Sequence, residues 1–341
     1  MISEIFQSFP MVPFIIIVIT LVLYKLKHSS RAEVFLSKIP GPLYPLIGSA
    51  WDLNLPNDVL TEVAFSYRRI YGERFRIKLG PVNFIFLANP DDVEKLLTSS
   101  KHTEKGIMYS FLMPWLGTGL LTSKGERWHS RRKLLTPSFH FKILEDFVVI
   151  FNEQSKILVD ILREDFKDHE ERDICKYLTT CALDIIGEAA MDIKFNSQRN
   201  QDIPYVKSVY KACEVVQYQI LRPHLWLNFI FKLTRAGREY TTAIKILHDF
   251  TTEVIKARKS APAIMNKEAD KNTNNDDIYW HGKRRLAFLD LLIEAQKNPE
   301  NNLSDTDIRE EVDTFMFEGH DTTSASLFWT TFLLGCNPIH Q

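Results

Sequence analysis

Cysteine is scarce in this chain of 341 residues, which contains four cysteines and no C-x-x-C spacing. This excludes a zinc knuckle and a disulfide framework, so the cysteines are expected to be reduced thiols in the cytosol. An excess of one charge is also missing: 42 Lys and Arg stand against 43 Asp and Glu, so nothing indicates a nucleic-acid partner. The 45% hydrophobic and 25% charged residues are typical of a globular protein with a large core.

One long apolar run occurs, over residues 9–26, and it predicts a membrane-spanning helix. Its strongest part, residues 11–24, is short for a span, so a cleaved signal peptide is the alternative. No positive charge precedes the run and no A-x-A site follows it, which favours a retained anchor at residues 1–28. The basic residues behind the run predict a lumenal N-terminus and a cytosolic body; they are Lys27, His28 and Arg31.

A basic and proline-rich linker is predicted next, over residues 29–45. Its Pro40 and Pro42 fix the backbone and remove hydrogen-bond donors, so they make a stiff elbow between the anchor and the body. The body, residues 46–341, is the part that is expected to fold as a domain.

The pattern of the body predicts a mainly α fold with a minor β-sheet. Apolar residues alternate over residues 74–87 and predict a β-hairpin with a turn at Gly80 and Pro81. Helical periodicity predicts helices at residues 91–99, 143–165, 174–191, 205–220, 237–258 and 285–296. Residues 261–282 are polar and predict a long surface loop.

Residues 225–231 form an unusually apolar stretch, LWLNFIF, directly after Arg222 and Pro223. Two interpretations stay open for it. The stretch packs in the core, or it forms a surface that dips into the bilayer near the anchor.

A single long helix is predicted over residues 305–334. Ser304 is the expected N-cap, with Asp307 at the third helical position, and Gly335 followed by Pro338 is a stop signal. At about 1.5 Å per residue such a helix is about 45 Å long and crosses a whole domain. It cannot span a membrane, because lipid would surround its acidic residues Glu310, Glu311, Asp313, Glu318 and Asp321.

The middle of this helix carries the unusual segment EGHDTT, from Glu318 to Thr323. A glycine such as Gly319 costs about 1 kcal/mol in a helix interior, but it lets a flat group approach the backbone. A threonine hydroxyl can bond the carbonyl four residues back and locally open the helix. Glu318, Asp321 and Thr322 lie on one face and make a credible proton-handling site. The alternative is a kinked core helix with acids that face solvent.

A basic helical segment, GERWHSRR, places Trp128 and Arg132 four residues apart, so that both side chains face one way. Taken alone, such a spacing is common in surface pairs. The cations of this segment form either a solvated helix face or a docking surface for an acidic partner; they are Lys124, Arg127, Arg131, Arg132 and Lys133.

These motifs together resemble cytochrome P450 monooxygenases, over essentially the whole chain. The segment EGHDTT is similar to the family's oxygen-binding motif, [A/G]-G-x-[D/E]-T-[T/S], and GERWHSRR to its W-x-x-x-R motif. The thirteen residues EVDTFMFEGHDTT, from Glu311 to Thr323, resemble the signature of the fourth P450 family, the fatty-acid ω-hydroxylases. The apolar anchor and the IPGP elbow resemble those of microsomal members.

The resemblance implies a P450 fold with an N-terminal transmembrane helix, a haem cofactor and the following roles. Trp128 and Arg132 would bind the haem propionates, Gly319 would lie against the haem, and Glu318 would be able to esterify a haem methyl group. Asp321 and Thr322 would deliver protons to bound oxygen.

The resemblance also implies partners and a location. NADPH–cytochrome P450 reductase would supply electrons to the hydroxylation of a fatty acid or another lipophilic substrate by O2, at the cytosolic face of the endoplasmic reticulum membrane. The family usually lines its substrate channel with residues that correspond to 106–121 and 213–233.

The family's segment for the axial cysteine, F-x-x-G-x-R-x-C-x-G, does not occur in this sequence. No residue is therefore assigned as a metal ligand, and residues 46–341 are expected to form an incomplete domain that ends after the oxygen-binding helix. Without the thiolate this chain is expected to be inactive alone. The alternative is a non-catalytic, membrane-tethered product. A membrane di-iron oxygenase would need histidine clusters that the ten scattered His do not form.

Overall fold

The structure, a computed structural model, describes residues 15, 16, 18, 19, 31–44, 48, 49, 52, 53, 55, 57–139, 141–168, 170–200, 203–260 and 287–341. The predicted anchor over residues 1–28 lies outside this set except for four residues, and so does the predicted loop over residues 261–282. Among the described residues, no helix combines the length and the apolar character that a bilayer span requires.

The chain divides into two compact units, Met1–His102 with Leu221–Pro223, and Thr103–Ile220 with His224–Gln341. The first unit contains the predicted hairpin, in which two antiparallel strands pair from Arg74 opposite Leu87 to Leu79 opposite Val82. Around the hairpin lie three helices, of which α4 and α3, the latter inside the predicted linker, were not predicted. The elements are α3 (Arg31–Leu36), α4 (Asn57–Tyr71), β1 (Arg74–Leu79), β2 (Val82–Leu87) and α5 (Pro90–Leu97).

The alternation of the sequence explains the hairpin. Phe75, Ile77 and Leu79 all point to the buried face of β1, and the ring of Phe75 stacks on that of Phe86 with their centroids 4.9 Å apart. Gly80 has a φ of 53° at the turn, which a side chain would disfavour. The prediction of a minor sheet is confirmed.

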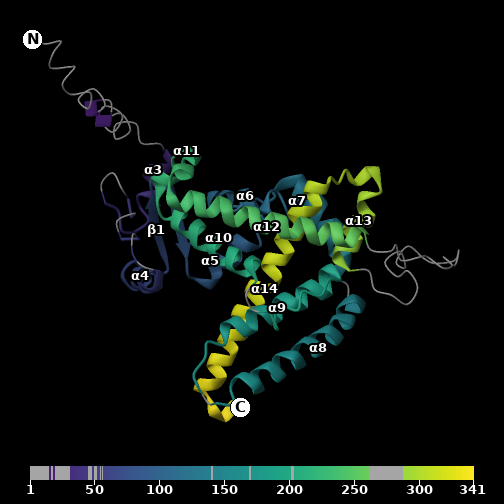
Figure 1. The fold of residues 1–341 in the computed structure, drawn as a ribbon. Coiled ribbons are helices and arrows are strands. Elements are labelled where there is room, and N and C mark those ends of the chain that lie inside the picture. The colour runs from purple at the N-terminus through teal and green to yellow at the C-terminus, as the bar shows by residue number, and fades with distance from the viewer. Residues whose placement is uncertain are drawn as a thin grey trace, which may run out of the picture. The chain divides into compact units, whose positions relative to one another are not determined.

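The second unit is helical throughout its described part and confirms the prediction of a mainly α fold (Figure 1). Its elements are η1 (Ile107–Phe111), α6 (Met113–Leu116), α7 (Gly125–Leu135), η2 (Thr136–Phe139), α8 (Phe141–Asp165), α9 (Cys175–Met191), α10 (Pro204–Ile220), η3 (Pro223–Trp226), α11 (Asn228–Leu233), α12 (Arg235–Ser260), α13 (Phe288–Gln296), η5 (Pro299–Asn301), α14 (Asp305–Cys336) and η6 (Pro338–His340).

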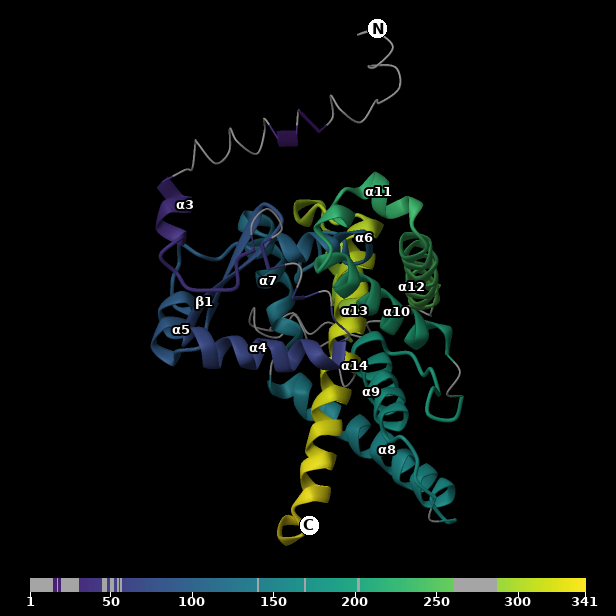
Figure 2. The same ribbon diagram turned by 90° about the vertical axis from the view of Figure 1, so that its left-hand side faces the viewer.

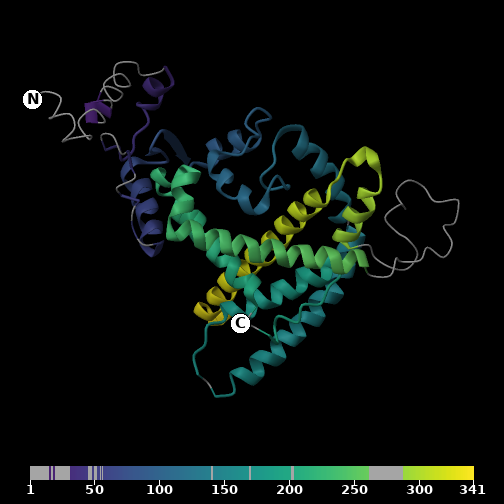
Figure 3. The same ribbon diagram turned by 45° about the horizontal axis from the view of Figure 1, so that its top comes forward.

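The core of this unit is built around α14, which packs along α9 and is crossed by α12 (Figures 1 and 3). Leu183 of α9 and Val312 and Met316 of α14 are completely buried at these contacts. The C-terminal part of α14 continues past α9 (Figure 2). Its last turns carry exposed apolar side chains, among them Trp329 and Phe332.

The four cysteines are free thiols, as predicted, but their surroundings differ. Cys181 is buried, and burial raises its pKa to about 11; burial likewise raises the pKa of Cys213 to about 12. Both are therefore neutral thiols at pH 7. Cys336, expected to be a small buried or neutral thiol like the others, is exposed at the end of α14.

The core-packing interpretation holds for only part of the apolar stretch over residues 225–231. Leu225 and Phe231 are buried in the core, whereas Leu227 and Phe229 are 54% and 67% exposed. The reason is that the stretch crosses from η3 into the short helix α11, which has one inner and one outer side.

Candidate cofactor-binding site on helix α14

Helix α14 begins as the sequence predicts. Ser304 is its N-cap: the hydroxyl accepts a hydrogen bond from the Asp307 amide at 3.1 Å, and the Asp307 carboxylate accepts one from the Ser304 amide at 2.8 Å. The helix ends at Cys336, two residues beyond the predicted end. Thr322 Oγ1 donates to the carbonyl of Glu318 at 2.6 Å, as predicted. The expected local opening is wrong, because α14 stays α-helical through this point.

One face of α14 carries the candidate site. Helix periodicity places four residues on that face: Glu311, Phe315, Glu318 and Thr322. The segment α7–η2 covers the first half of this face, since Arg131 Nε lies 3.7 Å from Glu311 Oε1 and the Phe139 ring stacks on Phe315 with centroids 5.6 Å apart. The helix that bears Trp128 and Arg132 therefore lies along the same face of α14 as Glu318 and Thr322.

The polar residues of the predicted site differ in exposure. Glu318 is partly buried, and desolvation raises the pKa of its carboxyl, although the positive charge of Lys105 opposes this. Thr322 is exposed. Asp321 is turned toward α10, where its negative charge helps to raise the pKa values of Tyr210 and Cys213. Glu318 and Thr322 thus lie on the same side of α14, and Asp321 lies at the edge of that side.

Gly319 has a different neighbour from the flat group that the sequence predicts. A Cβ atom built on Gly319 would lie 2.6 Å from Cδ1 of Ile186 in α9. The missing side chain therefore allows α9 and α14 to approach each other, and the expected reason for this glycine is corrected to helix packing.

His320 was not predicted as a site residue. It follows Gly319 in the motif, before Asp321, and its side chain is completely buried. Its Nδ1 lies 2.6 Å from the Met316 carbonyl, so this nitrogen carries the proton, and Nε2 has no partner among the described residues. Burial lowers the pKa of the imidazole, which is therefore neutral at pH 7.

A second unpredicted group lies two turns earlier in α14. Asp313 is completely buried, and its Oδ2 lies 3.6 Å from both Arg309 and His248. Burial raises its pKa to about 7. No sequence signal marked either group, because their burial depends on the elements that pack against α14.

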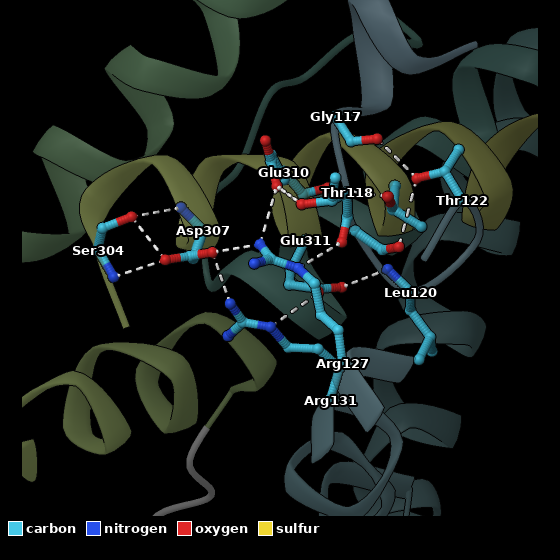
Figure 4. Close-up of polar contacts among 12 residues, drawn as sticks. Gly117, Thr118, Leu120, Thr122, Arg127, Arg131, Ser304, Asp307, Glu310 and Glu311 are labelled. Carbon is cyan, nitrogen blue, oxygen red and sulfur yellow. Dashed lines mark hydrogen bonds and ion pairs between the residues drawn. The ribbon is translucent and has the colours of Figure 1, made fainter. Parts of the chain in front are cut away.

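The basic residues of α7 have partners that the sequence did not reveal (Figure 4). Arg127 and Arg131 both donate to Asp307 Oδ1 at 2.6 Å, and Arg127 lies 3.5 Å from Glu310 Oε2. Arg131 is 8% exposed. The solvated face is therefore wrong for Arg131, whereas Arg127, whose side chain is 45% exposed, pairs with these acids at the surface. Lys124 pairs with Glu104 at 3.4 Å.

Acidic residues of α14 also accept hydrogen bonds from the loop before α7. Glu310 Oε2 accepts a hydrogen bond from the Thr118 hydroxyl at 2.9 Å, and Glu311 Oε2 accepts one from the Leu120 amide at 3.1 Å (Figure 4). Burial raises the pKa of Glu311 to about 7. The hydrogen bond from Leu120 and the charge of Arg131 both lower this pKa, but by less, and Arg131 lies closer to Asp307 than to Glu311. These contacts fix α7 on α14 and thereby place Trp128 and Arg132.

We expect the buried carboxyl of Glu311 to make the free energy of unfolding depend on pH. Its pKa is raised in the folded state, so folding takes up a proton and the free energy of unfolding falls as pH rises from about 4.5 to 7. Between pH 5 and pH 7 the loss from Glu311 is about 2 kcal/mol. Glu311→Gln, which keeps an acceptor for Leu120, removes this part of the slope in urea titrations. An unchanged slope would contradict the raised pKa, and Glu126→Gln at an exposed position of α7 is the control.

Trp128 and Arg132 are one residue beyond Arg127 and Arg131, and so point to another side of α7. Trp128 is partly buried, and Arg132 is exposed. Arg132 has no acidic partner within ion-pair distance among the described residues, in contrast to Arg131. A guanidinium left without a protein carboxylate is suited to a carboxylate of a ligand.

An apolar cavity lies elsewhere in the same unit, with a volume of about 660 Å³. Phe111, Met113 and Pro114 line it from one segment, and Trp226, Phe231 and Tyr240 from another. The structure thus brings together residues of the two segments, 106–121 and 213–233, that were expected to line a substrate channel. Trp115 and Leu116 do not contribute, because they are buried in the core.

A family profile decides the relationship that these features indicate. The profile described as "Cytochrome P450" matches residues 39–341. The chain belongs to the cytochrome P450 family. It is 44% identical over 334 residues to "Cytochrome P450 4c3" of Drosophila melanogaster, an alignment that covers 95% of this chain and 62% of that protein.

Two further relatives lie in the same part of the family. "Cytochrome P450 4V2" of Homo sapiens is 44% identical over 86% of this chain and 56% of its own length. "Probable cytochrome P450 4s3" of Drosophila melanogaster is 41% identical over 92% of this chain and 62% of its own length. The resemblance to the fourth P450 family is confirmed. The chain spans about three fifths of the length of these relatives.

The P450 family implies a haem, and the donor set of α7 and α14 fits one. Haem presents carboxylates, and Arg132 is a cation that no described acid neutralises. Trp128 adds an indole N–H donor on the same side of α7. The observation at Gly319 does not contribute to this fit, because the space that a Cβ would fill belongs to Ile186.

Proposed function

We propose that this chain binds haem and serves a P450 monooxygenase that hydroxylates fatty acids or similar lipophilic substrates. One observation carries the proposal: α7, with its unneutralised Arg132, lies on the face of α14 that carries Glu318 and Thr322. Haem supplies the oxidising chemistry when it is bound; the protein supplies binding, orientation and protons.

Different residues of the chain have different roles in this proposal. Trp128 and Arg132 bind the haem propionates, which form charge-assisted hydrogen bonds with a guanidinium. Thr322 is exposed and Asp321 partly buried, so they can pass a proton from solvent along α14. Gly319 keeps the helix close to α9, and the partly buried Glu318 is the group that we propose as a covalent haem anchor.

The finer parts of the proposal come from the family and its fourth-family relatives. NADPH–cytochrome P450 reductase is the proposed electron donor, O2 the co-substrate, and the cytosolic face of the endoplasmic reticulum membrane the location. The cavity of about 660 Å³ supports a lipophilic substrate, since aromatic and aliphatic side chains form much of its lining.

The 341 residues alone are proposed to be catalytically inactive, because none of the four cysteines lies in the thiolate motif of the family. Burial raises the pKa values of Cys181 and Cys213, which disfavours a thiolate at either. The alternative is a non-catalytic, membrane-tethered product. A thiolate-type Soret band of the reduced chain under carbon monoxide would overturn the proposed inactivity.

Haem titration of the purified chain tests the site. Arg132→Gln is expected to weaken haem binding by about tenfold, because a charge-assisted hydrogen bond to a propionate is lost. The change in Soret absorbance on adding ferric haem measures the affinity. Lys133→Gln removes a neighbouring exposed cation and is expected to change the affinity less than about twofold.

Equal effects of the two substitutions would contradict the propionate role of Arg132. Extraction with acidified solvent tests the proposed anchor in a complete, active P450 that carries this chain. Denatured protein is expected to retain haem, and the Glu318→Ala variant to release it. Equal retention by both proteins would remove the ester from the proposal.

A further inference from the structure

The side of α14 away from Glu318 and Thr322 carries buried polar side chains that the candidate haem site does not use. Asp313 and His320 are seven residues apart, so both lie on this side of the helix. Tyr205 of α10 faces them, because the centroid of its ring lies 5.9 Å from that of His320. Polar groups of two helices thus meet in the core of the second unit.

Two of these side chains each have a polar atom to which no described residue is hydrogen-bonded, namely the Tyr205 hydroxyl and His320 Nε2. Tyr205 is 1% exposed and His320 is 0% exposed. Polar groups buried in folded proteins nearly always have a hydrogen-bond partner. The two atoms are complementary, since His320 Nδ1 carries the proton toward the Met316 carbonyl and leaves Nε2 as an acceptor, whereas a hydroxyl both donates and accepts.

Asp313 supplies a third polar group near the Tyr205 hydroxyl. Burial raises the pKa of Tyr205 well above its ordinary value, and the negative charge of Asp313 raises it further. Asp313 Oδ2 lies 3.6 Å from Arg309 and from His248, which is longer than a hydrogen bond. A carboxylate has about four lone-pair sites, so the hydrogen bond from Thr251 leaves Asp313 able to accept others.

Apolar side chains surround these polar groups. Phe250 of α12 packs on the Tyr205 ring with centroids 4.6 Å apart, and Met316, between Asp313 and His320 in α14, is completely buried. A few polar atoms enclosed in this way suit a small ligand that both donates and accepts hydrogen bonds. Buried water is such a ligand, and it typically makes about three hydrogen bonds.

We propose that one water molecule binds between α10 and α14, hydrogen-bonded to the Tyr205 hydroxyl, to His320 Nε2 and to the Asp313 carboxylate. By donating to Nε2, the water keeps the imidazole in the tautomer whose proton is on Nδ1. The water also joins α10 to α14 beside the segment EGHDTT. Haem has no part in this site, so the site is tested on the haem-free chain.

Magic-angle-spinning NMR of the full chain, labelled with 15N at histidine and held in phosphatidylcholine bilayers, tests the proposal. The His320→Gln variant identifies the resonances of His320. Magnetisation is expected to pass from water protons to His320 Nε2, because the water lies within hydrogen-bond distance of this nitrogen. Tyr205→Phe is expected to abolish the transfer and to shift the Nε2 resonance, since a buried water that loses a partner is held less well.

The control is Tyr210→Phe, which makes the same change in α10 at a hydroxyl that shares a hydrogen bond with Thr179 Oγ1 at 3.0 Å. It is expected to leave the transfer and the Nε2 resonance unchanged. Equal effects of the two variants would overturn Tyr205 as a partner of the water. A wild-type chain without transfer would overturn the water itself, and a resonance that then still shifts in Tyr205→Phe would replace it with a direct hydrogen bond from Tyr205. Equal helix content by circular dichroism shows that a loss is not due to misfolding.

Discussion

Arg131→Met lowers the free energy of unfolding by about 3 kcal/mol, because the substitution removes the buried cation of the α7–α14 contact and leaves Asp307 paired with Arg127 alone. Arg131 is 8% exposed; it donates to Asp307 at 2.6 Å and faces Glu311, which is 1% exposed. The loss is expected to be larger at pH 8 than at pH 5, since the pKa of Glu311 is about 7 and its carboxyl becomes neutral in acid. Urea unfolding at both pH values measures it.

The matched control is Arg132→Met on the same helix. Arg132 is exposed and has no acidic partner in the described part of the chain, so the free energy of unfolding is expected to change by less than about 0.5 kcal/mol. The two neighbouring arginines are thereby separated into a structural and a ligand-binding role. A loss of the same size in both variants would contradict this division.

Gly319→Leu lowers the free energy of unfolding by about 3 kcal/mol even without haem, because the new side chain collides with α9. Its Cβ alone would lie 2.6 Å from Ile186 Cδ1, which is closer than real Cβ atoms approach. Leucine is a good helix former, so the propensity of the helix cannot explain a loss. Thermal or urea unfolding of the haem-free chain measures the effect.

Gly335→Leu provides the comparison within α14. Among the described residues, no atom outside the neighbouring helix backbone lies within 4 Å of a Cβ built on Gly335. Leucine there is therefore expected to leave stability unchanged or raise it by up to about 1 kcal/mol. A haem-free Gly319→Leu chain that is as stable as the wild type, but binds haem poorly, would restore the original interpretation of Gly319 as part of a haem surface.

Much of the fold follows from local patterns in the sequence. The alternation in β1, the capping residues Ser304 and Asp307, and the helical periods of α8, α9, α10 and α12 each depend on neighbours within a few residues. Such short-range signals survive without knowledge of the tertiary structure. Helix α4 was missed, although its residues Asn57–Tyr71 form four turns with an amphipathic pattern.

The candidate site was only partly predictable. The motif residues Glu318 and Thr322 and their i, i+4 hydrogen bond follow from helix geometry. The roles of neighbouring arginines do not: Arg131 and Arg132 are identical in chemistry and adjacent in sequence, yet one is buried against Asp307 and the other is exposed. The buried state of His320 and Asp313 was equally invisible, because burial depends on the elements that pack against α14.

The sequence by itself determined most of the secondary structure, the P450 motifs and the helix face that Glu318 and Thr322 share. Only the tertiary structure decided which charges are neutralised and what Gly319 touches. The physical reason is the separation along the chain over which each interaction acts. Helix periodicity and capping act between residues a few positions apart, whereas desolvation, ion pairing and close packing depend on side chains that meet across as many as 192 positions of the chain, as Thr118 and Glu310 do.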